Sequence, residues 1–394
     1  MAILDDTKLL LCQLIAFPTV STDSNIALIE FLADRLQAVG ARVDILPDAT
    51  GEKANLFATL GPEVDGGIML CGHSDVVPVT DQDWTTDPFA MIERDGKLFG
   101  RGSCDMKGFI AAAVAMAPVY AERVRDRPIH FAFTHDEETG CLGALGLAQV
   151  LQAQGIRPGV AIIGEPTSMR VIEGHKGCFE YSTHFTGLEG HGSAPDLGVN
   201  AVEFAVRYVG RLLDLKEQLK ARAPAKGRFD PPWTTINTGA LVGGIAHNVI
   251  PGKARIDWEM RPVQGGDADF VKAEMRHFCA HTLLPAMREV CASADIVTEV
   301  MGEIDGLIPA EENEARDILM ELTGANGADL VAFGTEAGIF QKLGMSAVVC
   351  GPGSIEQAHK PDEYLSVDQL SQCLTMLEGL SDKLAPQRRH DARR

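Results

Sequence analysis

Long apolar segments are missing from this chain, and so is a basic leader followed by an apolar core. No run of about 18 apolar residues occurs, so we expect no membrane-spanning segment. The first ten residues, MAILDDTKLL, carry acids early, which is not typical of a secretory signal. We therefore expect no membrane partner.

Closely spaced cysteine pairs are missing as well. The nine cysteines are scattered and odd in number, and none forms a CxxC motif. This argues against a disulfide-stapled secreted scaffold and predicts reduced thiols in a cytoplasmic protein. Cys71 and Cys104 lie beside the candidate ligands described below. Cys71 stands inside the apolar run GIMLCGH and is expected to be a small buried filler rather than a metal thiolate.

Positive charge is scarce. There are 35 Lys and Arg against 55 Asp and Glu, which gives a formal net charge of −20. A polyanion is repelled on average by such a protein, so nucleic acid is not an expected partner, whereas a cationic small substrate is tolerated. The basic ending, QRRHDARR, is expected to be a solvated tail rather than a binding patch.

What is present is an apolar fraction of 45% in 394 residues, enough for a large core and more than one domain. Short apolar runs alternate with segments of helical spacing, which predicts an α/β fold whose mostly parallel sheet has helices on both faces. The expected helices are 5–16, 24–39, 107–120 and 140–154, and the expected strands are 41–46, 54–60, 67–73, 128–138 and 159–166.

The pattern changes near residue 178. The segment CFEYSTHFTG alternates like a half-exposed strand and is the first element of a β-α-β-β-α-β order. We therefore expect residues 178–303 to form an inserted α+β domain with one antiparallel sheet. The other domain is expected to be discontinuous, with residues 1–177 and 304–394.

Five candidate metal ligands lie far apart in the chain, each just past an apolar stretch. They are His73, Asp105, Glu138, Glu165 and His359. Open α/β sheets bind ligands outside the carboxyl ends of their strands, so we expect these side chains to converge. Each residue alone is more often a cap or a solvated charge. Burying several carboxylates together without a cation is costly, and imidazole mixed with carboxylate suits zinc or a similar divalent ion.

Two further acids accompany these ligands. Asp75 stands two residues after His73, a spacing that lets its carboxylate accept the second imidazole N–H. Glu137 directly precedes Glu138, and neighbours on a strand point to opposite sides. One of the two glutamates can therefore hold metal while the other faces a water molecule.

Several motifs resemble those of the di-zinc aminoacylase and carboxypeptidase-like amidohydrolases. They are GHSDVVPV, LFGRGSCDMKG, DEETG, GEPTS, GHGSAPDLGVNA and GPGSIEQAHKPDEY. The resemblance runs from about residue 8 to 380, and IIGEPTSMRVIEGHKG makes the chain most similar to the acetylornithine deacetylase branch. That branch hydrolyses N²-acetyl-L-ornithine, a small N-acyl amino acid, to L-ornithine and acetate.

The resemblance also implies a cofactor: two zinc ions per subunit, for which Co²⁺ can substitute. His73 and Glu165 would hold one ion, Glu138 and His359 the other, and Asp105 would bridge them. The peptide bond after Asp105 would be cis.

The remaining implied roles concern catalysis and substrate. Glu137 would be the general base and Asp75 would orient His73. His191, in the insert, would reach a neighbouring subunit's site, which makes the insert a lid and dimerisation domain in a homodimer. The implied substrate-binding residues are Asn248, Arg261, Thr335 and Gly353.

Other functions remain open at this point. Succinyl-diaminopimelate desuccinylase, acetylcitrulline deacetylase and a broad aminoacylase would share the chemistry. A non-catalytic metal- or amino-acid-binding protein on the same scaffold would be expected to lack the base or a ligand, and here all are present. The HFCAH segment places His277 and His281 one helical turn apart but lacks the glutamate that a zinc-protease helix requires, so we expect a surface or packing role.

Overall fold

The computed structural model describes residues 2–384 and divides into two compact units. Unit 1 contains Met1–Gly174, Pro309–Val331 and Thr335–Arg394, and unit 2 contains His175–Ile308 and Ala332–Gly334. Unit 2 thus extends a few residues beyond the expected insert of residues 178–303 at both ends. The reason is a β-bridge between His175 and Leu307, which lie just outside that segment. The tail QRRHDARR lies outside the described residues.

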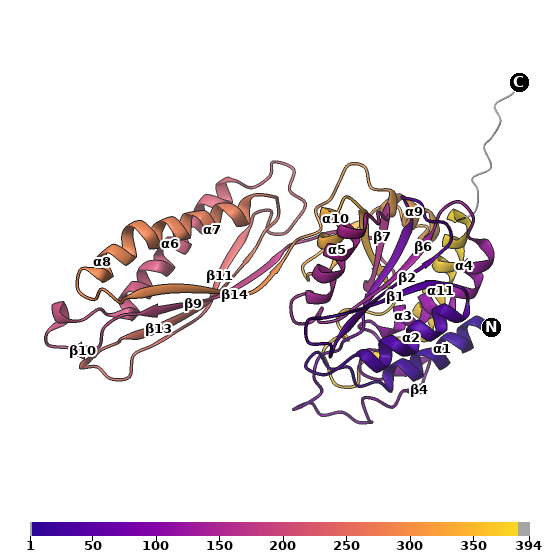
Figure 1. Ribbon diagram of the computed structural model, residues 1–394, viewed down its shortest axis with the longest axis horizontal. Helices are drawn as coiled ribbons and strands as arrows, with labels where there is room; N and C mark the ends of the chain where they lie inside the picture. Colours follow the sequence, from indigo (N-terminus) through magenta and orange to yellow (C-terminus); the bar gives the residue numbers. More distant parts are fainter. Residues whose placement is uncertain (1, 385–394) are drawn as a thin grey trace, which may run out of the picture. The chain divides into compact units, whose positions relative to one another are not determined.

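Unit 1 is built on an eight-stranded sheet with a parallel centre (Figure 1). Strands β6, β3, β7 and β16 are parallel neighbours, whereas β1, β2 and β8 pair antiparallel at the sides. The order is β1 (Arg42–Pro47), β2 (Ala54–Leu60), β6 (Ile129–Thr134), β3 (Ile68–His73), β7 (Val160–Pro166), β16 (Ser346–Gly351), β8 (Ile172–His175) and β15 (Asp329–Val331). The predicted α/β class with a mostly parallel sheet is confirmed.

Helices cover both faces of this sheet (Figure 1). One layer contains α1 (Ala2–Ile15), α2 (Ile26–Ala38), α3 (Lys107–Ala115), α4 (Ala117–Arg123), α9 (Glu314–Thr323) and α11 (Val367–Leu380). The other contains α5 (Leu142–Gln154) and α10 (Ala337–Lys342). Because both faces are covered, β2, β3, β6 and β7 are buried along their whole length, which is why the sequence shows them as continuous apolar runs.

Two local features of unit 1 go beyond the sequence pattern. The single helix expected over 107–120 is two helices, since Pro118 stands in the first turn of α4 and cannot donate to the preceding turn. A separate three-stranded sheet joins β4 (Ile92–Arg94), β5 (Lys97–Phe99) and β17 (Tyr364–Ser366). It brings residues near 100 beside residues near 363, although these are far apart in sequence.

Unit 2 contains a four-stranded antiparallel sheet in the order β11 (Thr235–Gly243), β13 (Lys253–Arg261), β9 (Cys178–Thr186) and β14 (Asp295–Ile304). Helices α6 (Ala201–Ala221) and α7 (Asp267–Phe278) share its core, and α8 (Leu284–Arg288) follows. Alternate residues of β9 and β13 enter that core, among them Tyr181 and Trp258, whose rings stack 4.6 Å apart. A short ribbon pairs β10 (Gly190–His191) with β12 (Val249–Ile250).

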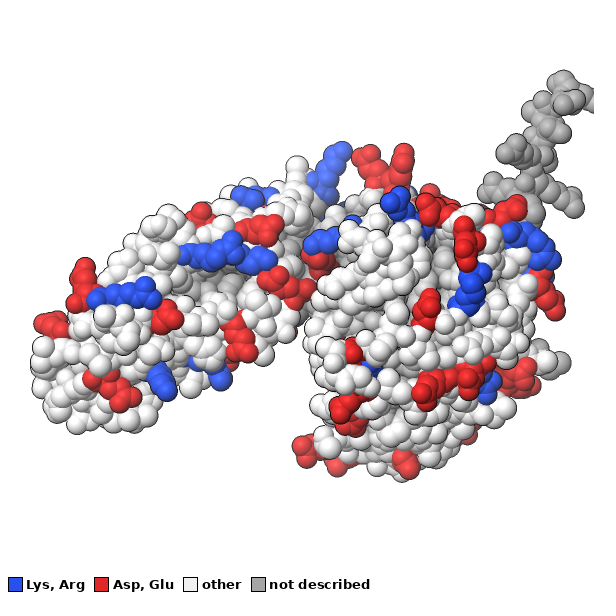
Figure 2. Space-filling view, in the orientation of Figure 1, with Lys and Arg blue, Asp and Glu red and all other residues white. Residues whose placement is uncertain are grey.

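The surface agrees with the acidic composition. On the face shown in Figure 2, basic side chains of the described residues form short stripes between acidic ones and no broad basic area. Of the described helices, none is both long and apolar enough to cross a membrane.

Candidate metal centre

The candidate ligands of unit 1 gather at the carboxyl ends of neighbouring strands. His73 is the last residue of β3, and Glu165 lies near the end of the adjacent parallel strand β7. Glu138 follows β6, the other parallel neighbour of β3. Asp105 stands just before α3, and His359 stands in the loop after β16. The sheet therefore positions three of these side chains and connecting segments position two.

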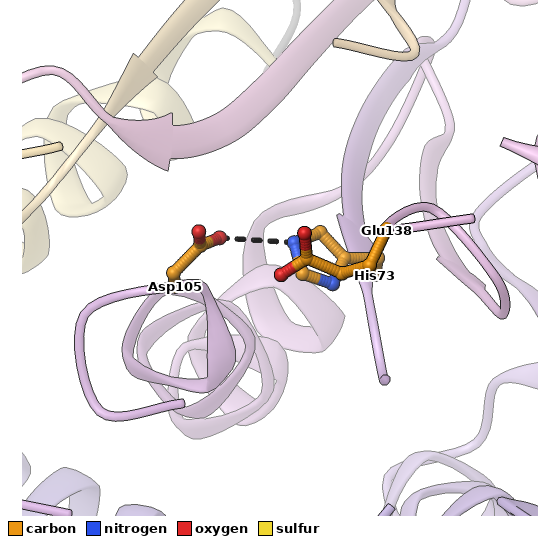
Figure 3. A group of neighbouring side chains, drawn as sticks. All are labelled: His73, Asp105 and Glu138. Carbon is orange, nitrogen blue, oxygen red and sulfur yellow. Dashed lines mark hydrogen bonds and ion pairs between the residues drawn. The ribbon is translucent and has the colours of Figure 1, made fainter. Parts of the chain in front are cut away.

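Asp105 lies between the two imidazoles. Its Oδ1 is 3.0 Å from Nε2 of His73, and its Oδ2 is 3.4 Å from Nε2 of His359. His73 is also 3.7 Å from Glu165 Oε1, and His359 is 3.1 Å from Glu138 Oε2. Figure 3 shows Asp105 and Glu138 converging on the His73 ring. The Asp105 carboxylate thus has one oxygen facing the His73–Glu165 pair and the other facing the His359–Glu138 pair.

Two groups in this cluster have ligand atoms that lie within 4.8 Å of one another. One group is His73, Asp105 and Glu138, and the other is His73, Glu137 and Glu165. The second contains the glutamate expected to be the base, so Glu137 lies next to the ligands. Neither Cys71 nor Cys104 belongs to any such group within residues 2–384.

The donor set fits divalent cations. Asp105 and Glu165 are both buried, and burial together with the charge of Asp105 raises the pKa of Glu165 well above its ordinary value. Burial also raises the pKa of Glu137, and the charge of Glu138 adds to this effect although His73 opposes it. Several buried carboxylates resist being ionised together, and bound cations would stabilise their charged forms. Carboxylate oxygens combined with imidazole nitrogens are also ligands that suit divalent ions such as zinc.

Asp75 contacts its neighbours differently from the expectation. The Nδ1 atom of His73 is 2.9 Å from the backbone oxygen of Asp75 and 3.6 Å from its carboxylate. The carboxylate instead accepts hydrogen bonds from Ser21 Oγ at 2.6 Å and from the backbone N–H groups of Glu137 and Glu138 at 3.2 and 3.4 Å. Asp75 therefore fixes the His73 ring mainly through its carbonyl and the glutamate turn through its side chain.

Three of the predicted residues lie in unit 2. His191 is exposed in β10, with Nδ1 2.8 Å from Ser193 Oγ. Asn248 is exposed just before β12, and its carbonyl accepts from Gly192 N at 2.7 Å, so it shares the short ribbon with His191. Arg261 ends β13, half-buried and paired with Glu259 at 2.8 Å. Among these three, the structure brings His191 and Asn248 together.

The remaining two predicted residues have local structural roles. Thr335 is fully buried, and its hydroxyl accepts a hydrogen bond from Ala337 N at the start of α10. Gly353 has a φ of 95°, and a Cβ there would stand 2.5 Å from Cys104 Sγ. Glycine is therefore required by both conformation and space. A direct substrate contact of either residue stays a prediction.

Two buried acids beside the centre were not predicted. Glu336 follows Thr335 and accepts hydrogen bonds from Thr134 Oγ1 at 2.5 Å and from Cys71 Sγ at 3.3 Å. Glu363, in the HKPDEY motif, accepts hydrogen bonds from the backbone N–H groups of Cys104 and Asp105. The motifs that contain these two glutamates were used to predict neighbouring residues instead. The sequence signal that could have identified them is an acidic residue next to an apolar segment. The peptide bond between Asp105 and Met106 is cis, as the resemblance implies.

Comparisons with known proteins cover nearly the whole chain. The model of peptidase family M20/M25/M40 matches residues 69–383. A protein of Photorhabdus laumondii named acetylornithine deacetylase is 36% identical over 381 residues, covering 94% of this chain and 95% of its own length. A protein of the same name from Klebsiella pneumoniae is 37% identical over 360 residues, covering 89% and 91%.

Solved structures share the fold at low identity. A tripeptidase from Staphylococcus aureus has a TM-score of 0.71 at 18% identity and covers 98% of this chain and 99% of its own. A Bacillus subtilis protein described as a dinuclear metal binding peptidase has a TM-score of 0.63 at 16% identity and covers 96% and 98%. The sequence matches show that the chain belongs to peptidase family M20/M25/M40 and is an amidohydrolase.

Proposed function

We propose that this enzyme hydrolyses N²-acetyl-L-ornithine to L-ornithine and acetate with two zinc ions per subunit. The observation that carries the chemistry is the position of Asp105, whose two oxygens face His73 at 3.0 Å and His359 at 3.4 Å. The substrate rests on the relatives named acetylornithine deacetylase, which align over nearly the full chain. The reaction would be a cytoplasmic step of arginine biosynthesis.

The ions would be held as the motifs imply: one by His73 and Glu165, the other by Glu138 and His359, with Asp105 between them. When bound, they would polarise the amide carbonyl and lower the pKa of a water molecule from about 15.7 toward 7. Co²⁺ has similar ligand preferences and would substitute for zinc.

Glu137 would move the proton. Its backbone N–H is fixed by the Asp75 carboxylate at 3.2 Å, and its side chain lies beside His73 and Glu165. Glu137 would accept a proton from the attacking water and donate it to the leaving amine. Burial raises the pKa of Glu137, whereas bound cations nearby would lower it.

Residues of unit 2 would recognise the substrate. His191 and Asn248 both expose hydrogen-bonding groups on one ribbon and would stabilise the oxyanion, an effect of about 3 kcal/mol for a well-placed donor. Arg261 would bind the α-carboxylate, because a planar guanidinium forms two parallel bonds to it. In this role it would share its charge with Glu259, its present partner.

The proposed partner is a second copy of the chain, joined through unit 2. Strand β11 is an edge of its sheet, and α6 packs beside it. Exposed apolar residues occur on both elements: Val206 and Leu213 on α6, and Leu241 and Val242 on β11. An edge strand flanked by apolar side chains can pair with its own copy around a two-fold axis.

A mixing experiment tests the dimer and the role of His191 together. Glu137→Gln and His191→Ala chains should each be nearly inactive. After subunit exchange in equal amounts, half of the dimers combine one chain of each kind, and one of their two sites is complete. We therefore expect about a quarter of the wild-type activity. A monomeric protein in sedimentation, or no recovery despite verified exchange, would contradict His191 acting across subunits.

A substrate panel tests the proposed reaction. Amine release should be fastest with N²-acetyl-L-ornithine and slower with acetylcitrulline, because a cationic side chain suits this acidic protein. Succinyl-diaminopimelate should react least, because its succinyl carboxylate needs an additional cationic partner. Exclusive turnover of the succinylated compound would reject the deacetylase. No hydrolysis of any N-acyl amino acid would favour a binding protein on the same scaffold.

A further inference from the structure

A buried carboxylate lies beneath the turn that carries Asp105. Glu363 is 1% exposed, and its Oε1 accepts hydrogen bonds from the backbone N–H groups of Cys104 at 2.8 Å and Asp105 at 3.0 Å. Its Oε2 accepts from Gly102 N at 3.1 Å. Three N–H groups of one turn therefore point at a single carboxylate, which fixes the backbone of the residue between the two imidazoles.

An arginine joins this carboxylate to the second ligand loop. Arg101 is also 1% exposed, and its Nη1 is 2.6 Å from Glu363 Oε2. Its Nη2 donates to Gln82 Oε1 at 2.7 Å, and Gln82 Nε2 donates to the backbone oxygen of His359 at 2.9 Å. A continuous chain of hydrogen bonds therefore runs from the backbone of Asp105 to the backbone of His359.

This connection matters because of where the ligands stand. His73 and Glu165 lie on adjacent paired strands, so the sheet sets their separation. Asp105 and His359 lie on two connecting segments, and His359 adopts a φ of 63° with half of its side chain exposed. The hydrogen-bonded chain links these two segments directly. These are the two segments whose side chains approach each other, with 3.4 Å between Asp105 Oδ2 and His359 Nε2.

Accepting the proposed two-ion function, we propose that Arg101 and Glu363 are positioning residues for the half of the centre formed by Asp105, Glu138 and His359. The pair mainly sets the affinity for the ion in that half, where it positions both the Asp105 turn and the His359 loop. The other ion shares only Asp105 with this arrangement and otherwise depends on His73 and Glu165, which the sheet positions. Outer-shell partners of this kind typically change metal affinity by about 10- to 100-fold when lost.

The test is a Co²⁺ titration of the metal-free Glu363→Gln variant. Binding is measured by calorimetry and by the visible absorption of the bound Co²⁺. Wild type should bind two ions. The variant should keep one tight ion and bind the other about 10- to 100-fold more weakly, with loss of that ion's absorption bands. The matched control is Glu173→Gln, because Glu173 is also buried in unit 1 and pairs with Arg316 at 3.0 Å. This control should bind both ions normally.

A second variant covers the case in which Glu363→Gln does not fold. Gln82→Ala removes the hydrogen bond to His359 and the one from Arg101 Nη2, but it leaves both partners of the Arg101–Glu363 ion pair in place. It should weaken the same single ion to a smaller extent. Unchanged affinity for both ions in the folded variants would overturn the positioning role and leave the proposed function standing. Equal weakening of both ions would also overturn it. A wild type that binds fewer than two ions would overturn the proposed centre itself.

Discussion

Replacing Glu137 by glutamine is expected to lower kcat by about 100- to 10,000-fold, the usual contribution of a positioned acid–base group. Glutamine has the same shape and keeps the backbone N–H that donates to Asp75 at 3.2 Å. It cannot take up a proton from water or deliver one to the leaving amine. The measurement is steady-state amine release from N²-acetyl-L-ornithine, beside metal analysis of the same sample.

The metal analysis separates two roles for this residue. Glu137 lies within 4.8 Å of ligand atoms of His73 and Glu165, so it could be a ligand instead of a base. As the base, Glu137→Gln should retain two ions per chain while turnover falls. Loss of one ion with the activity would assign it to the ligand set, and a near-normal kcat would refute the assigned base.

Replacing Asp105 by alanine is expected to remove both ions and all measurable activity. The carboxylate supplies one oxygen toward His73 and the other toward His359, so both halves of the centre lose a donor. The drop in affinity should exceed the roughly 100-fold that loss of an outer-shell partner causes. Metal content after dialysis and chelator competition measure it.

Asp136→Asn is the matched control for this substitution. Asp136 is equally buried and stands next to Glu137, but its carboxylate contacts Lys53 and His135 rather than a candidate ligand. The control should retain two ions. If Asp105→Ala still bound one ion at full affinity, Asp105 would serve a single ion and would not bridge.

The sequence was most informative where the sheet positions the site. His73 and Glu165 stand at the ends of buried strands and Glu138 stands shortly after one, and parallel strands end at one edge, so their convergence could be predicted from the strands. The α/β alternation likewise predicted the class of fold. Asp105 and His359 also follow apolar segments, but they lie on connecting segments. Their distance from the other ligands therefore depends on the path of those segments, which the sequence pattern does not predict.

The sequence was least informative about contacts between distant segments. The partnership of Glu363 with the Asp105 turn depends on the pairing of β5 with β17, for which no periodicity exists in the chain. Glu336 directly precedes α10, and it contacts Thr134 and Cys71 because α10 packs against β7 and β16 on one face of the sheet. The spacing of Asp75 and His73 predicted that the two residues are in contact. It could not show whether the His73 ring contacts the backbone carbonyl or the carboxylate of Asp75.

The most direct test is the metal content of the purified wild-type chain after saturation with zinc and removal of loosely bound ions, combined with anomalous scattering from crystals. Two ions per chain, on either side of the Asp105 carboxylate, are the expected result. A chain that retains no zinc, or zinc held away from His73 and His359, would contradict the account.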